Sequence, residues 1–264
     1  MRPVAPRRTP GRGLRARAGG PVAAAVAAAA AAGYVLGIRP RLLRWGATPQ
    51  EAAGPLPGDE LVPAPRLQST RAVTIAAPPA VVWPWLLQLG SGRGGMYSYD
   101  FLENAVGLKM HSADRILTEF QQLAVGDAIP LAPGFGIPVR RLEDGAVLAL
   151  GGAMDPRTGQ PAPENAAGTR LAMGWTLVLQ PLGAGSTRLL SRTRYDYSPL
   201  VLGLPLRVVL EPVQFLMERR MLLGIRTRAE RRRPHSVRAA SGAGDGEAGA
   251  LGPTKRPPPD PTLG

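Results

Sequence analysis

The sequence predicts an α+β fold in which an antiparallel sheet of about six or seven strands packs against one long C-terminal helix. Three observations lead to this expectation. A run rich in β-branched residues begins at Thr70, and short strand-like segments separated by turn signals fill residues 128–197. An apolar stripe at helical spacing then covers residues 206–232. The alternation of strand and crossover helix that marks a parallel sheet is missing.

The positive charge of the 264-residue chain is concentrated at its two ends. Residues 1–44 carry a net charge of +9, residues 45–230 carry +1 and residues 231–264 carry +3, within a total of +13. A nucleic-acid-binding domain needs a basic face on its folded part, so we expect no nucleic-acid partner. The chain has no cysteine and two histidines, which excludes thiolate chemistry and argues against a metal site or other cofactor.

Residues 18–38 are free of charged side chains and follow a basic segment at residues 1–17. As a helix this stretch would be about 31 Å long, enough to cross the hydrocarbon core of a bilayer. We therefore expect a single-pass membrane anchor, with a cleaved secretory signal peptide as the alternative. Six arginines before the stretch and three shortly after it favour a cytoplasmic N-terminus.

A folded domain is expected over residues 70–232, preceded by a Pro- and Gly-rich linker or strap at 39–69. After a first strand at 70–76, Pro79 starts a short helix that ends at Gly90. A second short helix at 99–106 ends at Gly107.

Segments of high β-propensity then alternate with turn residues, which predicts antiparallel strands joined by hairpins. The expected strands are 128–131, 139–142, 146–150, 171–181 and 187–197, with a polar Gly/Pro loop at 151–169. Pro212 is expected either to kink the final helix or to fix its start. Residues 233–264 lack periodicity and are interpreted as a disordered tail.

Gly90, Gly92 and Gly95 spell G-x-G-x-x-G, and Asp114 follows at about the distance of a ribose-binding acid. A dinucleotide-binding loop needs a strand before it and a parallel unit around it. Here a helical segment containing Pro84 precedes the glycines, so we interpret them as a turn between helices.

Four blocks of the chain resemble a known superfamily. They are TRAVTIAAPPAVVWPWLLQLG, GMYSYDFLENAVGLKMHSADRI, LAVGDAI and EPVQFLMERRMLLGIRTRAE. Together, over roughly residues 40–232, they are similar to uncharacterised bacterial SRPBCC proteins of the START-like superfamily that are related to polyketide cyclase/dehydrase. That superfamily includes Bet v 1-type allergens and lipid-transfer domains. The resemblance implies the helix-grip fold, a curved sheet that grips the long helix around an apolar cavity.

A single curved sheet with one helix over it cannot close its core as a sandwich does, so a cavity for an apolar molecule is expected on physical grounds too. The first functional hypothesis is membrane-tethered binding or transfer of a lipid, isoprenoid or polyketide-like molecule. The expected partners are this hydrophobic small molecule and the bilayer. The alternatives are a polyketide cyclase or aromatase working by acid/base chemistry, and a scaffold with a filled core.

The polar residues between 97 and 115 are the candidates for chemistry. Tyr97, Asp100 and His111 are the catalytic candidates, because imidazole titrates near neutrality and a desolvated carboxyl can transfer protons. Asp100 and Glu103 are also spaced as a capping box, the interpretation that we favour for this pair. His111 is by default a hydrogen-bonded structural residue.

The candidate ligand-binding residues combine this cluster with side chains expected at the cavity wall. Met217 and Met221 lie one turn apart and suit an adaptable wall, with simple core packing as the alternative. Arg192 faces either solvent, the default, or the cavity mouth, where it would hold a ligand carboxylate or phosphate. The full set is Trp85, Tyr97, Tyr99, Glu103, Asn104, His111, Asp114, Arg115, Trp175, Arg192, Met217 and Met221.

Overall fold

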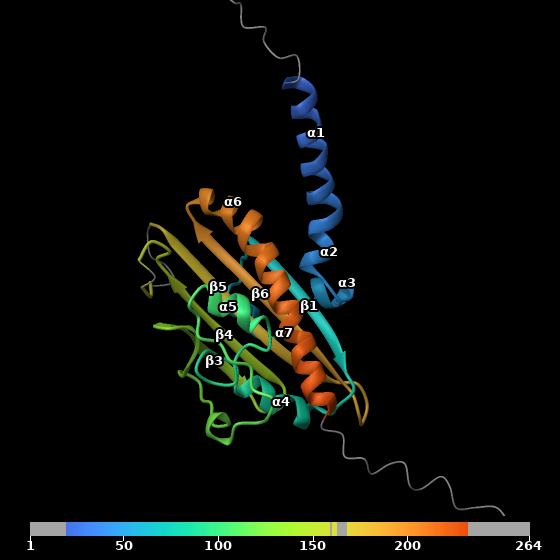
Figure 1. The fold of residues 1–264 in the computed structure, drawn as a ribbon, viewed down its shortest axis with the longest axis vertical. Coiled ribbons are helices and arrows are strands. Elements are labelled where there is room, and N and C mark those ends of the chain that lie inside the picture. The colour runs from blue at the N-terminus through green and yellow to red at the C-terminus, as the bar shows by residue number, and fades with distance from the viewer. Residues whose placement is uncertain (1–19, 159, 163–167, 232–264) are drawn as a thin grey trace, which may run out of the picture. The chain divides into compact units, whose positions relative to one another are not determined.

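The computed structural model describes residues 20–158, 160–162 and 168–231 (Figure 1). The expectations for the basic segment 1–17 and for the tail 233–264 concern residues outside these ranges. The elements are α1 (Gly20–Gly33), η1 (Tyr34–Ile38), α2 (Arg39–Leu43), α3 (Pro49–Ala53), η2 (Asp59–Leu61), β1 (Leu67–Ile75), α4 (Pro79–Leu87), α5 (Asp100–Ala105), η3 (Thr118–Phe120), β2 (Ala128–Ala132), β3 (Phe135–Glu143), β4 (Val147–Met154), β5 (Arg170–Pro181), β6 (Thr187–Ser198), η4 (Leu200–Leu202), α6 (Gly203–Pro205), η5 (Leu206–Leu210) and α7 (Glu211–Arg231).

The six strands form one antiparallel sheet in the order β1-β6-β5-β4-β3-β2. Each strand that the sequence predicts is present, extended by a few residues at one or both ends. The turn at Glu143–Gly145 joins β3 to β4, where Gly145 adopts a φ of 67° that favours glycine. The G-x-G-x-x-G segment follows α4 and precedes α5, so the interpretation as a turn between helices is confirmed.

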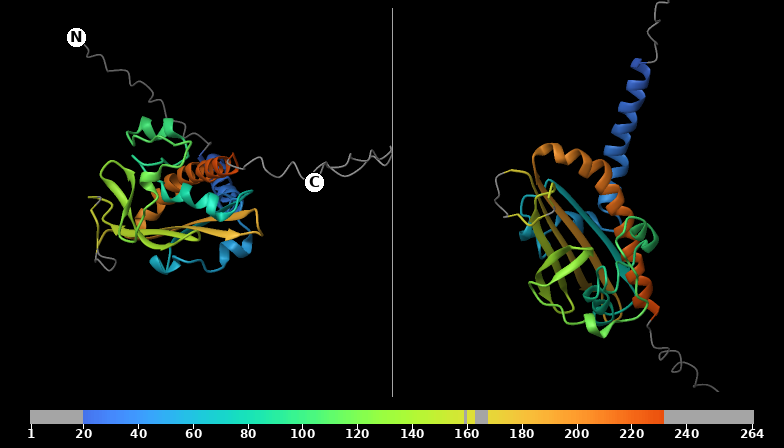
Figure 2. Two further views of the ribbon diagram at one scale, coloured as in Figure 1. Left: turned by 90° about the horizontal axis from the view of Figure 1, so that it is seen from below. Right: turned by 60° about the vertical axis from the view of Figure 1, so that its left-hand side comes forward.

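The long helix α7 and the short helix α4 pack on one face of the sheet (Figure 2). Large apolar side chains of both helices interleave with inward-facing residues of the strands, giving one continuous core that includes Trp85, Leu86, Leu150, Leu177, Leu189, Leu222 and Ile225. Pro212 is the second residue of α7, but the helical run is continuous from Gly203 through the π-helical turn η5 into α7, so Pro212 lies within it and does not fix its start. The irregular turn η5 directly precedes this proline, at the place where its missing N–H disturbs the regular hydrogen-bond ladder. The strand order and the position of α7 are those of the helix-grip arrangement.

The opposite face of the sheet is covered by residues 46–62, which include α3 and η2. Arginines of β6 hold this strap. Arg188 pairs with Glu51 through Nε and Nη2, each 2.8 Å from a carboxylate oxygen. Arg192 donates to Asp59 at 2.7 Å and to three backbone carbonyls of residues 51–54. Arg194 donates to the carbonyls of Asp59 and Val62.

Arg192 therefore faces neither solvent nor the cavity mouth, and both expectations for it were wrong. Its side chain is 2% exposed. It lies opposite Thr176 in the β5–β6 register, whereas Trp175 and Thr193 share the other face of the sheet. The strap is what buries it, because a guanidinium can enter a buried site only when acceptors surround it.

Two helices of the described chain are long and apolar enough to cross a membrane, by length and composition alone: Ala23–Leu43 and Leu200–Arg231. The first overlaps the expected anchor at residues 18–38. The second contains α7, whose inner side is part of the core.

Candidate functional site

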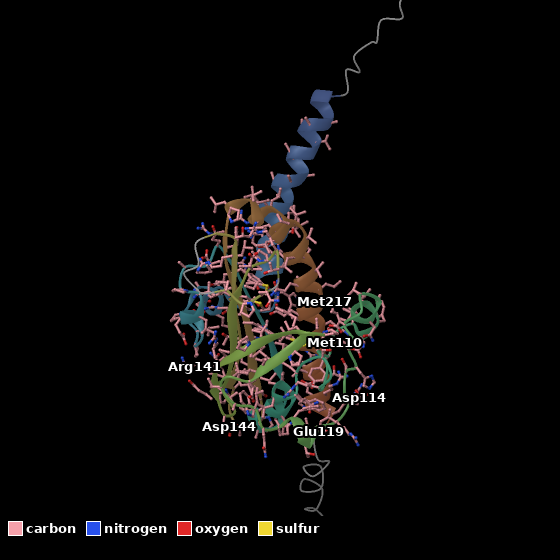
Figure 3. All side chains as sticks on the ribbon, turned by 90° about the vertical axis from the view of Figure 1, so that its left-hand side faces the viewer. Met110, Asp114, Glu119, Arg141, Asp144 and Met217 are labelled. Atoms are coloured by element: carbon pink, nitrogen blue, oxygen red, sulfur yellow. The ribbon has the colours of Figure 1, made fainter. Side chains whose placement is uncertain are left out.

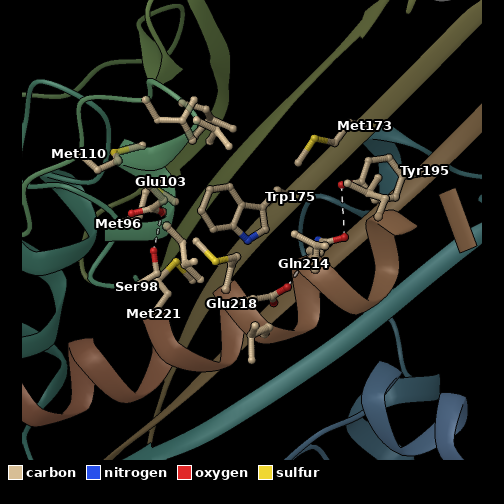
Figure 4. Close-up of a pocket in the computed structure, with 18 residues that line it drawn as sticks. Met96, Ser98, Glu103, Met110, Met173, Trp175, Tyr195, Gln214, Glu218 and Met221 are labelled. Atoms are coloured by element: carbon tan, nitrogen blue, oxygen red, sulfur yellow. Dashed lines mark hydrogen bonds between the residues drawn. The ribbon is translucent and has the colours of Figure 1, made fainter. Parts of the chain in front are cut away.

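A cavity of about 630 Å³ lies between α7, the strands β5 and β6, and the segment that contains α5 (Figure 4). Its lining residues are Met96, Ser98, Leu102, Glu103, Val106, Leu108, Met110, Leu131, Met173, Trp175, Tyr195, Leu210, Val213, Gln214, Leu216, Met217, Glu218 and Met221. Five of the seven methionines of the chain belong to this set. Figure 3 shows Met110 and Met217, from elements far apart in sequence, on the same side of the sheet.

One wall of the cavity depends on α5, a helix of six residues that is too short to be stable alone. Asp100 accepts hydrogen bonds from the backbone N–H of Ser112 at 2.7 Å and from its hydroxyl at 2.6 Å. The Asn104 amide exchanges two hydrogen bonds with the backbone of Met110, at 2.8 and 2.6 Å. These bonds close residues 100–112 into a loop that presents Leu102, Glu103 and Val106 to the cavity.

This arrangement corrects the capping-box interpretation. Tyr99 occupies the N-cap position of α5 and makes no side-chain cap, while Asp100 is the first helical residue. The carboxylate of Asp100 closes the loop instead of capping the helix, and Glu103 turns inward.

Tyr97 joins the glycine turn to the long helix. Its hydroxyl donates to the carbonyl of Trp85 at 3.2 Å, and the Arg228 guanidinium lies 4.8 Å from its ring centre. Gly224 of α7 approaches so closely that an added Cβ would lie 2.3 Å from the Tyr97 carbonyl oxygen. Burial raises the pKa of the Tyr97 hydroxyl. Tyr97 is thus a packing residue beneath the cavity wall.

Glu103 is the buried acid of α5, with 5% of its surface exposed. The Ser98 hydroxyl donates to its Oε1 at 2.6 Å, and its buried Oε2 has no hydrogen-bond partner among the described residues. Burial raises the pKa of Glu103, the neighbouring Asp100 raises it further, and the Ser98 bond opposes the change. A carboxyl in this state can exchange a proton or accept a donor from a ligand.

Glu218 is the second acid at the cavity, and it belongs to a buried ion pair. Arg71 of β1 donates Nη1 to its Oε2 and also contacts Ser69. The Oε1 of Glu218 is buried without a hydrogen-bond partner among the described residues. Gln214 contacts Oε2 at 3.5 Å and the Tyr195 hydroxyl at 3.4 Å, which makes a thin polar stripe along α7 (Figure 4).

Four of the candidate ligand-binding residues line the cavity: Glu103, Trp175, Met217 and Met221. The indole N–H of Trp175 is bonded to Ser191 at 2.9 Å, so this residue offers the cavity only its ring.

The other candidates lie elsewhere. Trp85 and Tyr97 are in the core, Asn104 holds the loop, and Tyr99 packs under Arg220. His111 and Arg115 are exposed, Asp114 pairs with Arg228 at the surface, and Arg192 is under the strap. None of the three catalytic candidates, Tyr97, Asp100 and His111, is among the lining residues.

Sequence reasoning missed Glu218, Gln214, Tyr195 and three of the methionines as cavity residues. In sequence, Glu218 lies between Met217 and Met221, two residues of the predicted apolar stripe. An acidic residue beside that stripe was a signal that could have marked it as a cavity residue. The described residues contain no group of His, Asp or Glu that could hold a metal ion.

No protein-family model and no curated protein matches the sequence. Among solved structures the chain is similar to a protein from Mesorhizobium loti, at 16% identity, a TM-score of 0.35, and coverage of 62% of this chain and 99% of that one. A hypothetical protein from Helicobacter pylori aligns at 15% identity and a TM-score of 0.36, over 67% and 96% of the two chains.

Norcoclaurine synthase from Thalictrum flavum, in complex with dopamine and hydroxybenzaldehyde, aligns at 13% identity and a TM-score of 0.34, over 64% and 88%. The helix-grip arrangement itself follows from the strand order and the placement of α7.

Proposed function

We propose that this protein binds a hydrophobic small molecule, of the lipid, isoprenoid or polyketide-like type, in the cavity between the sheet and α7. The cavity carries the proposal. Its volume of about 630 Å³ falls within the range of small-molecule sites. Thirteen of its eighteen lining residues are Leu, Val, Met or Trp, and flexible methionines allow the wall to adapt to its ligand.

The test is ligand recovery and dye binding with the full chain. Native mass spectrometry should detect a co-purified apolar molecule, and the neutral dye Nile red should bind with a blue-shifted emission. Met217→Trp, which fills the cavity, should weaken dye binding about tenfold or more, since a lost buried contact of about 1.4 kcal/mol has that effect. Leu182→Trp is the matched control, because Leu182 is exposed and does not line the cavity. An empty protein with unchanged dye binding in Met217→Trp would contradict the proposal.

The proposal includes a membrane tether at residues 18–38. Within the described part of this stretch, Val35, Leu36 and Ile38 are exposed, as expected of side chains that face lipid. Full-length protein should fractionate with membranes and resist carbonate extraction, and deletion of residues 1–44 should release it. A mature N-terminus near Ala32 or Gly33 would establish a cleaved signal peptide instead.

A second apolar surface supports contact with lipid. Leu200, Leu204, Val208, Val213 and Leu216 are all more than 40% exposed along the start of the long helical region. Two of them, Val213 and Leu216, also line the cavity. Exposed apolar side chains in such a contiguous set mark an interaction surface, and here that surface adjoins the cavity.

Polyketide cyclase or aromatase chemistry is the second candidate, and Glu103 is the observation that favours it. A buried carboxyl with a raised pKa at an apolar cavity can donate a proton in catalysis. If the protein cyclises a polyketone, Glu103→Gln should abolish turnover while Nile red still binds. Unchanged turnover in this variant would remove Glu103 from the chemistry.

A further inference from the structure

The charged side chains that line the cavity are both acids. Glu103 comes from α5 and Glu218 from α7, and the remaining polar lining consists of Ser98, Tyr195 and Gln214 (Figure 4). No lysine, arginine or histidine is among the described lining residues. A cavity of this composition has nothing to offset the charge of a ligand carboxylate or phosphate, whose burial would be costly.

Each acid keeps one oxygen free. Oε2 of Glu103 and Oε1 of Glu218 are buried and lack a hydrogen-bond partner among the described residues. The two residues are 5% and 6% exposed, so bulk water does not readily replace the missing partner. A buried acceptor without a donor is destabilising, and a donor brought by a ligand would relieve it.

The protein's own donors are directed at the other oxygens. Ser98 donates to Oε1 of Glu103, and Arg71 donates to Oε2 of Glu218. Arg71 also donates Nη1 to Ser69 and Nε to the Leu42 carbonyl at 3.0 Å. It is outside the lining set, so it holds the carboxylate in place and does not serve as an anion receptor.

We infer that the ligand is an apolar molecule carrying a hydrogen-bond donor, a hydroxyl or an amine, which donates to the free oxygen of Glu218 and to that of Glu103 in its ionised form. This inference rests on the proposed function of the cavity and specifies the ligand's chemical class. Free fatty acids and other anionic amphiphiles are selected against. A hydroxyl and a protonated amine share the required chemistry, and a series of head groups separates them.

The experiment is displacement of Nile red from the full chain by amphiphiles of one chain length: decanol, decylamine, decyl methyl ether and decanoate. The ether accepts hydrogen bonds but cannot donate them, which makes it the matched control for the alcohol. We expect the alcohol or the amine to displace the dye at a concentration about tenfold lower than the ether or the acid, the effect of one hydrogen bond to a charged group. The better of the two identifies the donor as hydroxyl or ammonium.

The outcomes separate the two proposals. If Nile red does not bind, the hydrophobic-ligand function itself fails. If the dye binds, but the ether and decanoate displace it as well as the alcohol and amine do, the donor inference alone is overturned.

Glu103→Gln and Glu218→Gln test the assignment to these residues. A glutamine can keep the Ser98 bond through its Oε1 but presents an N–H group where the free acceptor was. At least one of the two variants should reduce the preference for donors about tenfold, while the exposed Glu119→Gln should not change it. Glu218→Gln also weakens the pair with Arg71, so its folding is checked by near-UV circular dichroism. Full donor preference in both folded variants would overturn the assignment.

Discussion

Arg39 and Glu211 form a bidentate ion pair, with Nε and Nη2 of Arg39 each 2.7 Å from a carboxylate oxygen of Glu211. The pair joins α2, which directly follows the apolar N-terminal helix, to the first residue of α7. The Glu211 side chain is 9% exposed and that of Arg39 is 24% exposed. Planar bidentate pairing of this kind is specific to arginine.

Arg39→Ala should therefore destabilise the protein by about 2 kcal/mol, less than a fully buried pair would lose, because Arg39 is partly hydrated. The measurement is chemical denaturation of the full chain followed by tryptophan fluorescence. Arg41→Ala is the control, since Arg41 makes an exposed bond to the Gly37 carbonyl and should cost under about 1 kcal/mol. Equal losses in the two variants would show that the pair contributes nothing specific.

The strap should make stability sensitive to acid. The Arg188 guanidinium lowers the pKa of Glu51 from 4.5 to about 2, with further help from the Thr48 backbone N–H. A carboxyl whose pKa is depressed in the folded state contributes stability above the unfolded value, and that contribution is lost as pH falls from about 4.5 towards 2. In thermal unfolding between these pH values, Glu51→Gln should have a shallower slope than the parent protein. The exposed Glu119→Gln should retain the parental slope.

Glu103 should give the folding stability the opposite dependence on pH. Because burial raises its pKa, the folded state binds its proton more tightly than the unfolded chain does. Its contribution is present below the unfolded pKa of 4.5 and is lost as pH rises through the folded value. The melting temperature of Glu103→Gln relative to the parent should therefore increase with pH above about 4.5. A constant difference across that range would mean that Glu103 ionises as freely in the fold as in the unfolded chain.

Gly224 should be intolerant of a side chain even though it lies within α7. Alanine favours a helix over glycine by about 1 kcal/mol, but the new Cβ would lie 2.3 Å from the Tyr97 carbonyl oxygen. We expect a net loss of about 1–3 kcal/mol in the free energy of unfolding as the two elements move apart. Gly185→Ala is the control, since a Cβ there meets nothing within 4 Å. A stabilised Gly224→Ala would contradict the close approach.

The exposed residues of the 97–115 cluster should contribute little to stability or to ligand binding. The Asp114 side chain is 79% exposed and lies 3.1 Å from Arg228, so Asp114→Ala should cost under about 1 kcal/mol and leave dye binding unchanged. Arg228→Ala should cost more, since it also loses the Tyr97 ring and a 2.8 Å bond to the Ala113 carbonyl. A large loss in Asp114→Ala would mean that the cluster is a buried site.

Local pattern was enough to predict the strands and the long helix. Proline and glycine punctuation placed the ends of most elements to within a few residues, and helical spacing identified Met217 and Met221 as neighbours on the inner side of α7. These signals act over a few residues, which is the range at which sequence periodicity reports structure.

Side-chain partners distant in sequence could not be predicted in the same way. Arg71 and Glu218 are 147 positions apart, and Arg192 and Asp59 are 133 apart. Nothing local distinguishes an arginine that faces solvent from one that a strap will bury. The three catalytic candidates were chosen for their residue types, whereas the cavity wall is set by how the α5 loop closes on Ser112 and Met110.

The strap has a consequence for how far the domain can travel. Between α2 and β1 the chain is fixed to the sheet at Gly46, at Glu51 and at Val62, and Arg39 is fixed to α7. A long flexible linker lets a tethered domain move far from its anchor and contact a second membrane. A protein anchored through residues 18–38 and held in this way has no such reach. Such a protein would bind and release its ligand at the membrane that anchors it, and would not carry the ligand between two membranes.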